Sequence, residues 1–189
     1  MPEDRNRAVS IGADLRALRR ARKLTLQAVA SRLGRSLGWL SQVERDISSP
    51  SITELRSFAG LYGVPLSLFF GTAEAPAEEA GRVVRQGARR VISDPGTGLH
   101  EELLSPDLGD DFEVVRSTFA PRAVLRDAFC RATTEIVYLV SGRLIIWLDG
   151  ERYEIAAGDS FRIRGESTRW ENPDDTPAVA IWAISPPIY

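Results

Sequence analysis

A short polar segment of the chain carries side chains that suit contact with a nucleic acid. Its sequence is GRSLGWLSQVERDISSPS, residues 34–51. The Gln42 amide has both a donor and an acceptor, the combination needed to bind the edge of a base. The Ser48 hydroxyl can donate to a phosphate oxygen, and a helix capped by Ser36 would present a favourable N-terminus to the same backbone. The segment therefore predicts recognition of DNA.

The apolar residues of this segment have the spacing of a helix. They recur at steps of three and four residues: Leu37, Leu40, Val43 and Ile47. We expect Leu40 and Val43 to anchor the helix to a core, which leaves Trp39, Ser41 and Gln42 on its outer side. For Trp39 two roles stay open: packing on a neighbouring side chain or on the linker, and contact with a base or sugar.

The elements around this helix are predicted from caps and breaks. Residues 11–70 show helical spacing interrupted by glycine and proline. We expect five helices: residues 11–22, a second helix capped by Thr25 that runs through Leu33, a third capped by Ser36, Thr53–Tyr62 closed by Gly63, and a short one from Pro65 through Phe70. The second and third, joined by a tight turn, form a helix-turn-helix, whose second helix enters the major groove.

The two parts of the chain differ in charge. Residues 1–70 contain 11 Lys/Arg and 6 Asp/Glu, which gives +5. Residues 71–189 contain the other 13 Lys/Arg and 20 Asp/Glu, which gives −7 and a total of −2. A polyanion would bind the first part and avoid the second.

Single histidine and cysteine residues exclude several kinds of site. His100 is the only histidine and Cys130 the only cysteine, so one chain cannot form an internal disulfide, a Cys-rich zinc site or a multi-histidine metal site. The chain has no apolar run that could span a bilayer, and its N-terminus does not read as a signal peptide. We therefore expect a cytoplasmic protein with no membrane partner.

The second part of the chain has a sequence pattern typical of β-strands. Residues 71–81, GTAEAPAEEAG, are small and acidic and predict a flexible linker between a domain at 1–70 and another at 82–189. Beyond the linker, short alternating or β-branched runs are separated by turn signals such as Gly142 and Asp149-Gly150. This pattern predicts an antiparallel barrel or sandwich, and hence an α+β protein of two domains.

The run TLQAVASRLGRSLGWLSQVERDISSPSITELRSFAGLYGVPLSLFF resembles the five-helix DNA-binding domain of the lambda-repressor-like, or XRE, family. The resemblance implies that the front of the third helix reads DNA: Ser36, Leu37, Gly38, Trp39 and Gln42. Apart from the resemblance, side-chain chemistry predicts further DNA contacts from Arg35, Ser41, Arg45 and Ser48. Arg45 can instead pair with Glu44 at the helix end. Leu26 stands where the family often has a DNA-contacting glutamine, which implies fewer polar contacts.

Residues 134–187, from TEIVYLVSG through AGDS to RWENP, resemble the cupin fold, a double-stranded β-helix or jelly-roll barrel. Metal-binding cupins have a glutamate where this chain has Glu135. Their histidine positions map here to Phe129, Arg131 and either Thr168 or Arg169, depending on the alignment. Since no histidine stands at any of them, we expect neither a metal nor another cofactor.

The same four barrel positions predict an effector site: Phe129, Arg131, Glu135 and Thr168. Arg131 with Glu135 could hold a carboxylate or phosphate, with Phe129 as an apolar wall. In the alternative interpretation, Arg131 and Glu135 only pair with one another inside a packed, ligand-free barrel.

Together these patterns predict a DNA-binding transcriptional regulator rather than an enzyme. One such module covers few base pairs, so we expect a homodimer on paired half-sites of double-stranded DNA, with strands IIWL and AIWAI supplying apolar surface for dimerisation. The barrel would bind a small effector without a metal, and Arg131 favours an anionic one. Two alternatives stay open: a metal-independent cupin isomerase or hydrolase that uses Glu135 or Tyr138, and a ligand-free DNA-binding dimer.

Overall fold

The computed structural model describes residues 10–69, 77–79, 81–93, 96, 98–106 and 108–188. The chain divides into two compact units. A helical unit comprises the chain through Arg90 together with Ser105–Asp111, and a β unit comprises Val91–Leu104 and Phe112–Ile188. Of the linker predicted at 71–81, residues 71–76 and 80 lie outside the described residues.

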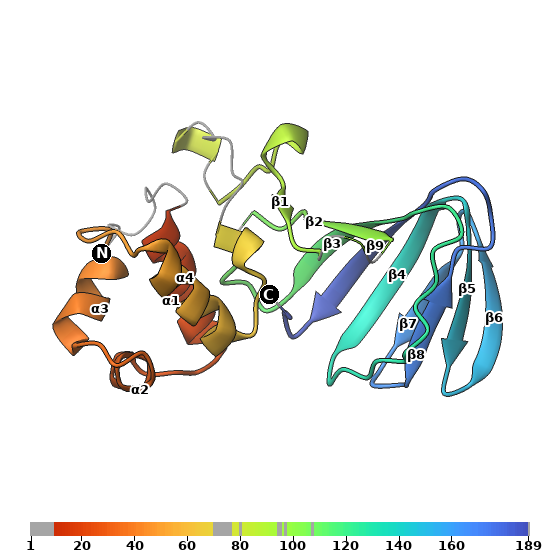
Figure 1. Cartoon of the computed structure of the whole chain (residues 1–189). Helices are drawn as coiled ribbons and strands as arrows, with labels where there is room; N and C mark the ends of the chain where they lie inside the picture. The colour runs from red at the N-terminus through yellow and green to blue at the C-terminus, as the bar shows by residue number, and fades with distance from the viewer. Residues whose placement is uncertain are drawn as a thin grey trace. The chain divides into compact units, whose positions relative to one another are not determined.

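The helical unit contains the predicted helix-turn-helix (Figure 1). Its helices are α1 (Ile11–Ala21), α2 (Leu26–Arg32), α3 (Leu37–Val43) and α4 (Ile52–Tyr62), followed by the 3-10 turns η1 (Leu66–Phe69), η2 (Ala77–Glu79) and η3 (Gln86–Ala88). Each α-helix begins at a serine or threonine whose side chain accepts a hydrogen bond from the backbone three residues on: Ser10, Thr25, Ser36 and Ser51. Apolar side chains from all four helices are fully buried, among them Leu15, Leu18, Val29, Leu40 and Phe58.

Several helices differ slightly from the sequence prediction, and α1 and α2 each end one residue earlier than expected, at Ala21 and Arg32. The expected fifth helix is the 3-10 turn η1, because its four residues close with a bond from the Leu68 backbone N–H to the Pro65 carbonyl, too short a span for an α-helix. Helix α4 begins at Ile52, one residue before the predicted start, because Ser51 and Glu54 cap each other's backbone reciprocally. Gly63 ends α4 in the left-handed conformation, as expected.

Helix α1 packs closely against the end of α3 at Gly12. A Cβ atom at this position would lie 2.3 Å from the Val43 carbonyl oxygen, so only glycine fits. The Asp46 carboxylate accepts a hydrogen bond from the Gly12 backbone N–H at 2.9 Å and another from the Ser10 hydroxyl at 2.6 Å. The end of the recognition helix is therefore fastened to the first turn of α1.

A buried ion pair provides a second link between α1 and α3. Arg19 donates to both oxygens of Glu44, at 2.6 and 2.8 Å, and its third donor reaches the Leu24 carbonyl at 3.0 Å. Glu44 is buried, and its hydrogen bond raises the pKa of Arg19. The sequence prediction that Glu44 pairs with Arg45 is therefore wrong. The planar guanidinium of Arg19 matches both carboxylate oxygens, whereas Arg45 points to solvent.

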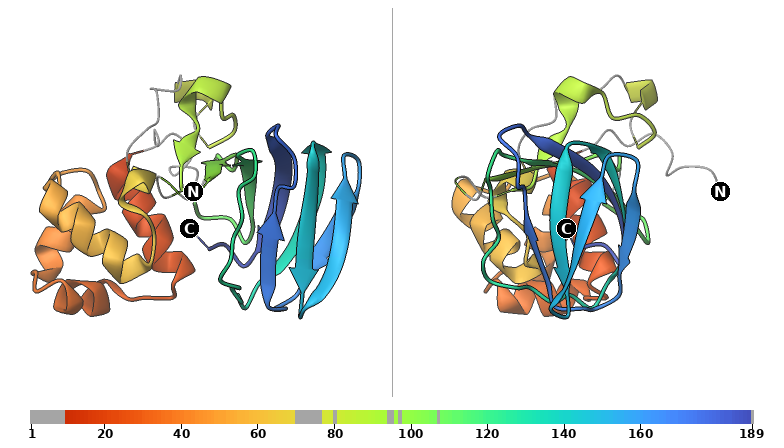
Figure 2. Two further views of the ribbon diagram at one scale, coloured as in Figure 1. Left: turned by 45° about the vertical axis from the view of Figure 1, so that its right-hand side comes forward. Right: turned by 90° about the vertical axis from the view of Figure 1, so that its right-hand side faces the viewer.

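The β unit consists of two sheets that enclose a core (Figure 2). The larger sheet has the order β1-β2-β3-β9-β4-β7 and the smaller one β6-β5-β8. The strands are β1 (Arg90–Val91), β2 (Leu99–Leu103), β3 (Glu113–Phe119), β4 (Thr134–Ser141), β5 (Arg143–Leu148), β6 (Glu151–Ala156), β7 (Ser160–Ile163), β8 (Thr168–Glu171) and β9 (Ala178–Ser185). This architecture confirms the predicted jelly-roll class.

Alternating burial shows which side of each strand faces the core. On β4, Val137 and Leu139 are fully buried while their neighbours along the strand are exposed. The two sheets meet where the Phe119 ring of β3 contacts the Trp170 ring of β8 edge to face, with centroids 4.7 Å apart. The core thus lies between the sheets.

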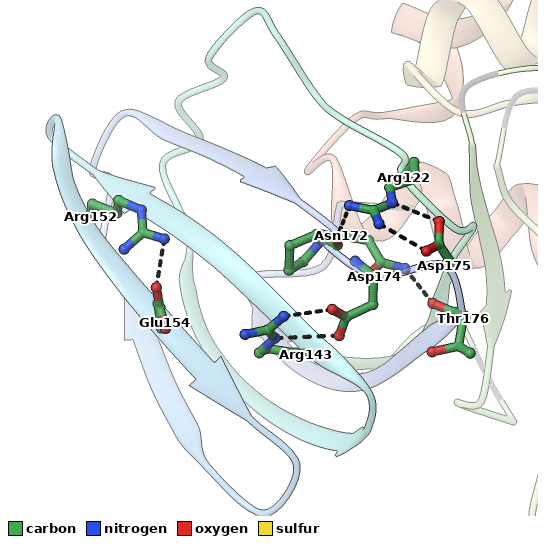
Figure 3. Close-up of polar contacts among 9 residues, drawn as sticks. Arg122, Arg143, Arg152, Glu154, Asn172, Asp174, Asp175 and Thr176 are labelled. Carbon is green, nitrogen blue, oxygen red and sulfur yellow. Dashed lines mark hydrogen bonds and ion pairs between the residues drawn. The ribbon is translucent and has the colours of Figure 1, made fainter.

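The turn between β8 and β9 is held by Asn172 (Figure 3). This fully buried side chain donates to the carbonyls of Phe119, Ala120 and Thr176 at 3.2, 3.0 and 2.9 Å. Its own oxygen accepts from the Asp174 backbone at 3.1 Å. We call these four hydrogen bonds of Asn172 the clamp. Outside it, two exposed ion pairs fix the same turn: Arg122 with Asp175, and Arg143 with Asp174. The R-W-E-N-P motif therefore serves to close this end of the barrel.

Candidate nucleic-acid interface and barrel interior

Helix α3 has a buried side and an exposed side. Leu40 and Val43 are buried in the helical core, as predicted. The opposite side exposes the predicted DNA-contacting residues to different degrees. Ser36, Leu37, Gly38 and Gln42 are exposed, and Ser41 and Trp39 are half-buried. The sequence prediction of a helix with one side in the core and a polar side outward is therefore confirmed.

Trp39 packs against α4 within its own unit. Its ring lies parallel to that of Phe58, with centroids 6.2 Å apart and an interplanar angle of 12°. The Arg35 guanidinium lies 5.2 Å from the centroid of the Trp39 ring, within the range of a cation–π contact. Of the two roles left open for Trp39, packing on a neighbour is the one seen in the free protein.

Arg35 also forms an ion pair with Glu54, at 2.6 Å. Half of the Arg35 side chain is exposed, and exposed pairs of this kind contribute only about 0–1 kcal/mol. A DNA phosphate could therefore compete with Glu54 for this arginine. Neither Glu54 nor Phe58 was singled out from the sequence, because both lie on α4, well beyond the helix-turn-helix.

The other polar side chains on and around α3 differ in the contacts that they make. The Ser48 hydroxyl donates to the Gln42 side-chain oxygen at 3.3 Å, which orients the exposed amide. The Ser36 hydroxyl accepts from the Trp39 backbone N–H at 3.1 Å and is therefore used as the helix cap. Arg45 is exposed and has no ion pair among the residues that the structure describes.

In the barrel, Phe129 and Thr168 are brought together as predicted. They form an isolated antiparallel bridge, with two backbone hydrogen bonds of 2.9 and 2.8 Å between them. Thr168 is buried, whereas Arg169 is exposed and stacks over Trp147 at 4.2 Å. Thr168 is therefore the inward residue of the two that the sequence alignment left open.

Arg131 and Glu135 do not form the ion pair predicted from the sequence. The Arg131 guanidinium lies over the Phe129 ring, 4.6 Å from its centroid. Glu135 is fully buried, and its Oε1 accepts a hydrogen bond from the Thr133 hydroxyl at 2.6 Å. Its Oε2 has no hydrogen-bond partner within the described part of the chain. The physical reason for the difference is that the Arg131 guanidinium stacks on the Phe129 ring, while the buried Glu135 carboxylate is bonded by the nearer Thr133 hydroxyl.

A second carboxylate that the sequence prediction missed lies on strand β2. Glu101 accepts a hydrogen bond from the Ser117 hydroxyl at 3.1 Å, and Ser117 is fully buried. Burial raises the pKa of Glu101, the nearby charge of Glu135 raises it further, and Arg131 lowers it. The alternation of β2 places Glu101 on the same side as the buried Leu103, which could have indicated its position.

Among the residues that the structure describes, no three His, Cys, Asp or Glu side chains gather as metal ligands. The same portion of the chain contains no helix with the length and apolar character needed to cross a membrane.

Comparison with known proteins identifies both units. The family described as "Helix-turn-helix domain" matches residues 10–69, and the family described as "Cupin domain" matches residues 116–184. The HTH-type transcriptional regulator DdrOP3 of Deinococcus deserti is 32% identical over 93 residues, which cover 49% of this chain and 70% of that protein. The chain belongs to the helix-turn-helix transcriptional regulators.

Two further proteins are similar to most of this chain. The HTH-type transcriptional regulator PuuR of Escherichia coli is 26% identical over 155 residues, covering 80% of this chain and 81% of that protein. A solved HTH_3 family transcriptional regulator from Vibrio cholerae has 22% identity and a TM-score of 0.45, covering 94% of this chain and 95% of that one. As a helix-turn-helix regulator with a cupin domain, the chain binds DNA.

Proposed function

We propose that this regulator acts in the cytoplasm as a homodimer, reads two DNA half-sites with its α3 helices, and binds a small effector in its barrel without a metal or a catalytic step. The domains would be residues 1–70 for DNA and 82–189 for the effector, joined at 71–81. The observation that carries the proposal is the exposed polar side of α3, with Gln42 outward while Leu40 and Val43 are locked in the core.

Each residue on this side has a definite role in the proposal. Gln42 reads a base edge with its oriented amide. Leu37 and Gly38 allow close approach, Ser41 adds a hydroxyl, and Arg45 binds phosphate. Trp39 contributes mainly by fixing Arg35 and the helix start against α4. Ser36 and Ser48 hold the helix end and the Gln42 amide in place.

Replacing Gln42 with alanine is expected to weaken binding to the selected operator by about 10- to 100-fold, since a good amide contact to a base discriminates by about 1–3 kcal/mol. The operator is first selected from genomic DNA with the purified full chain, and affinity is then measured by fluorescence anisotropy. The matched control is Gln86→Ala, which removes an exposed glutamine in η3 and should leave affinity unchanged. Unaltered sequence preference in Gln42→Ala would contradict the assigned reading side.

The outer face of β4 supplies the apolar surface for a dimer. Ile136, Tyr138 and Val140 are 48%, 49% and 49% exposed, and they follow one another on the same side of the strand. The strands predicted from the sequence to form the dimer, β5 and β9, expose less apolar surface, because Ile146 and Trp182 are buried in the core. A second copy of this chain suits such a face, since one face can serve both partners of a two-fold dimer and DNA half-sites require two reading helices.

Replacing Tyr138 with aspartate is expected to convert the dimer to a monomer and to lower operator affinity more than 10-fold, because a charge would be buried in an apolar interface. Analytical ultracentrifugation gives the mass, and anisotropy gives the affinity. Tyr153→Asp is the matched control, since Tyr153 on β6 is 45% exposed and outside the β4 face. Dimers of equal stability for both variants would rule out this face.

A further inference from the structure

Arg35 stands at the start of the recognition helix, in contact with both an aromatic ring and an acid. It directly precedes Ser36, the N-cap of α3. Its guanidinium lies 5.2 Å from the centroid of the Trp39 ring, and its Nη2 lies 2.6 Å from Oε1 of Glu54 on α4. The Trp39 ring is itself stacked on the buried Phe58. The guanidinium is therefore held beside the exposed side of α3.

The carboxylate of Glu54 uses its two oxygens for different partners. Its Oε2 accepts hydrogen bonds from the Ser51 backbone N–H at 2.7 Å and from the Ser51 hydroxyl at 2.8 Å, which leaves Oε1 for Arg35. The hydrogen bonds of Ser51 lower the pKa of Glu54, and the charge of Arg35 lowers it further, so the carboxylate is ionised at neutral pH. The acid can move away from Arg35 only by breaking the cap of α4.

A DNA phosphate and the Glu54 carboxylate compete for the same guanidinium, because arginine donates equally well to either anion. Half of the Arg35 side chain is exposed but only 18% of the Glu54 side chain, so a phosphate can reach the arginine without displacing the acid. Binding of DNA then exchanges one ion pair for another and brings two negative groups together. Such an exchange gains less free energy than a new contact with an unpaired arginine.

We propose that Glu54 is a positioning residue that weakens DNA binding by competing with the phosphate backbone for Arg35. The proposal rests on the DNA-binding role of the α3 side proposed above. Glu54 acts through Arg35 and makes no contact with DNA itself. Its effect does not depend on the DNA sequence, because contacts to phosphate carry no sequence information.

Glu54→Gln tests the competition, since the amide keeps one oxygen for the Ser51 N–H and removes the charge that faces Arg35. It is expected to strengthen binding of the full chain to its selected operator, and to a scrambled duplex of equal length, by the same factor of about 3 to 5 for each bound chain. Fluorescence anisotropy measures both affinities. The matched control, Glu78→Gln, removes an exposed acid in η2 and should leave both unchanged. Unaltered or weaker binding by Glu54→Gln, or a gain confined to the operator, would overturn the proposal.

A second substitution shows whether the acid acts through the arginine. When Glu54→Gln is introduced into an Arg35→Ala chain, most of the gain in affinity is expected to disappear, because the group for which the two anions compete has been removed. An undiminished gain would show that Glu54 acts only through the net charge of the unit, which contradicts the proposal.

The salt dependence of binding provides a readout that a merely structural role of Glu54 would not change. The unmodified chain exchanges an internal ion pair for a contact with phosphate and therefore releases fewer ions than Glu54→Gln. The plot of log affinity against log salt concentration is expected to be steeper for Glu54→Gln, so its advantage narrows as salt rises. An advantage of constant size at every salt concentration would indicate a structural change in α4 and refute the competition.

The same measurements separate this inference from the proposed function. A chain that selects an operator, but binds it no more tightly after Glu54→Gln, refutes the competition alone. A chain that selects no operator refutes the regulatory function itself. Thermal unfolding of each variant verifies that the helical unit is folded before its affinity is interpreted.

Discussion

Replacing Glu44 with alanine is expected to destabilise the helical unit by about 3–5 kcal/mol, the range found when one partner of a buried ion pair is removed. Arg19 would then keep its charge with only 12% of its side chain exposed and without its carboxylate. The loss should appear as a lower urea midpoint for the helical circular dichroism signal. DNA binding should fall with it, because the end of α3 loses its attachment to α1.

Two further variants separate the buried charge from a general effect of substitution. Glu154→Ala breaks the exposed pair with Arg152, which has about half of each side chain in solvent, and should cost less than about 1 kcal/mol. In the double variant Arg19→Met, Glu44→Leu, both charges are removed, and most of the stability should return. A loss below about 1 kcal/mol for Glu44→Ala would show that this pair does not hold α3.

Local signals in the sequence were sufficient to predict the recognition helix and the end of α4. The Ser36 cap, the apolar spacing of Leu40 and Val43, and the left-handed Gly63 all depend on residues within one or two turns. The structure confirms each of them. The exposed side of α3 follows directly from the same spacing, because a helix that buries one stripe must present the other to solvent.

Partners distant in the chain could not be predicted in this way. Glu44 was expected to pair with its neighbour Arg45, but it binds Arg19, 25 residues away. Trp39 stacks on Phe58 of α4 for the same reason: packing of helices, and not spacing along one helix, decides which side chains meet. The 3-10 geometry of η1 reflects its short length, which the apolar pattern did not disclose.

Which side chains face the barrel interior could be decided only from the register of the strands. The sequence resemblance allowed Thr168 or Arg169 as the inward residue, and only the pairing of β8 with β5 and with Phe129 distinguishes them. Glu101 was missed because the resemblance covered only residues 134–187 with specific motifs. Its alternation on β2 becomes informative once β2 is paired with β3, which places Glu101 opposite the buried Ser117.

Replacing Asn172 with alanine is expected to destabilise the β unit by about 3 kcal/mol, because each buried group left unsatisfied costs about 1–3 kcal/mol. The variant would leave the Ala120 and Thr176 carbonyls and the Asp174 N–H without the side-chain partner that now binds them. Thermal unfolding followed by tryptophan fluorescence reports on the barrel, since Trp170 lies in its core two residues from the clamp.

The matched control for Asn172 lies in the same turn. Arg143→Ala breaks the ion pair with Asp174 next to the clamp, but half of the Arg143 side chain is exposed (Figure 3). Its loss should therefore be below about 1 kcal/mol. If both variants unfolded at the same temperature, the turn would be held by its surface charges rather than by the buried amide. The larger loss for Asn172→Ala would show that the geometry of this end depends on the buried Asn172 amide and the backbone carbonyls that it satisfies.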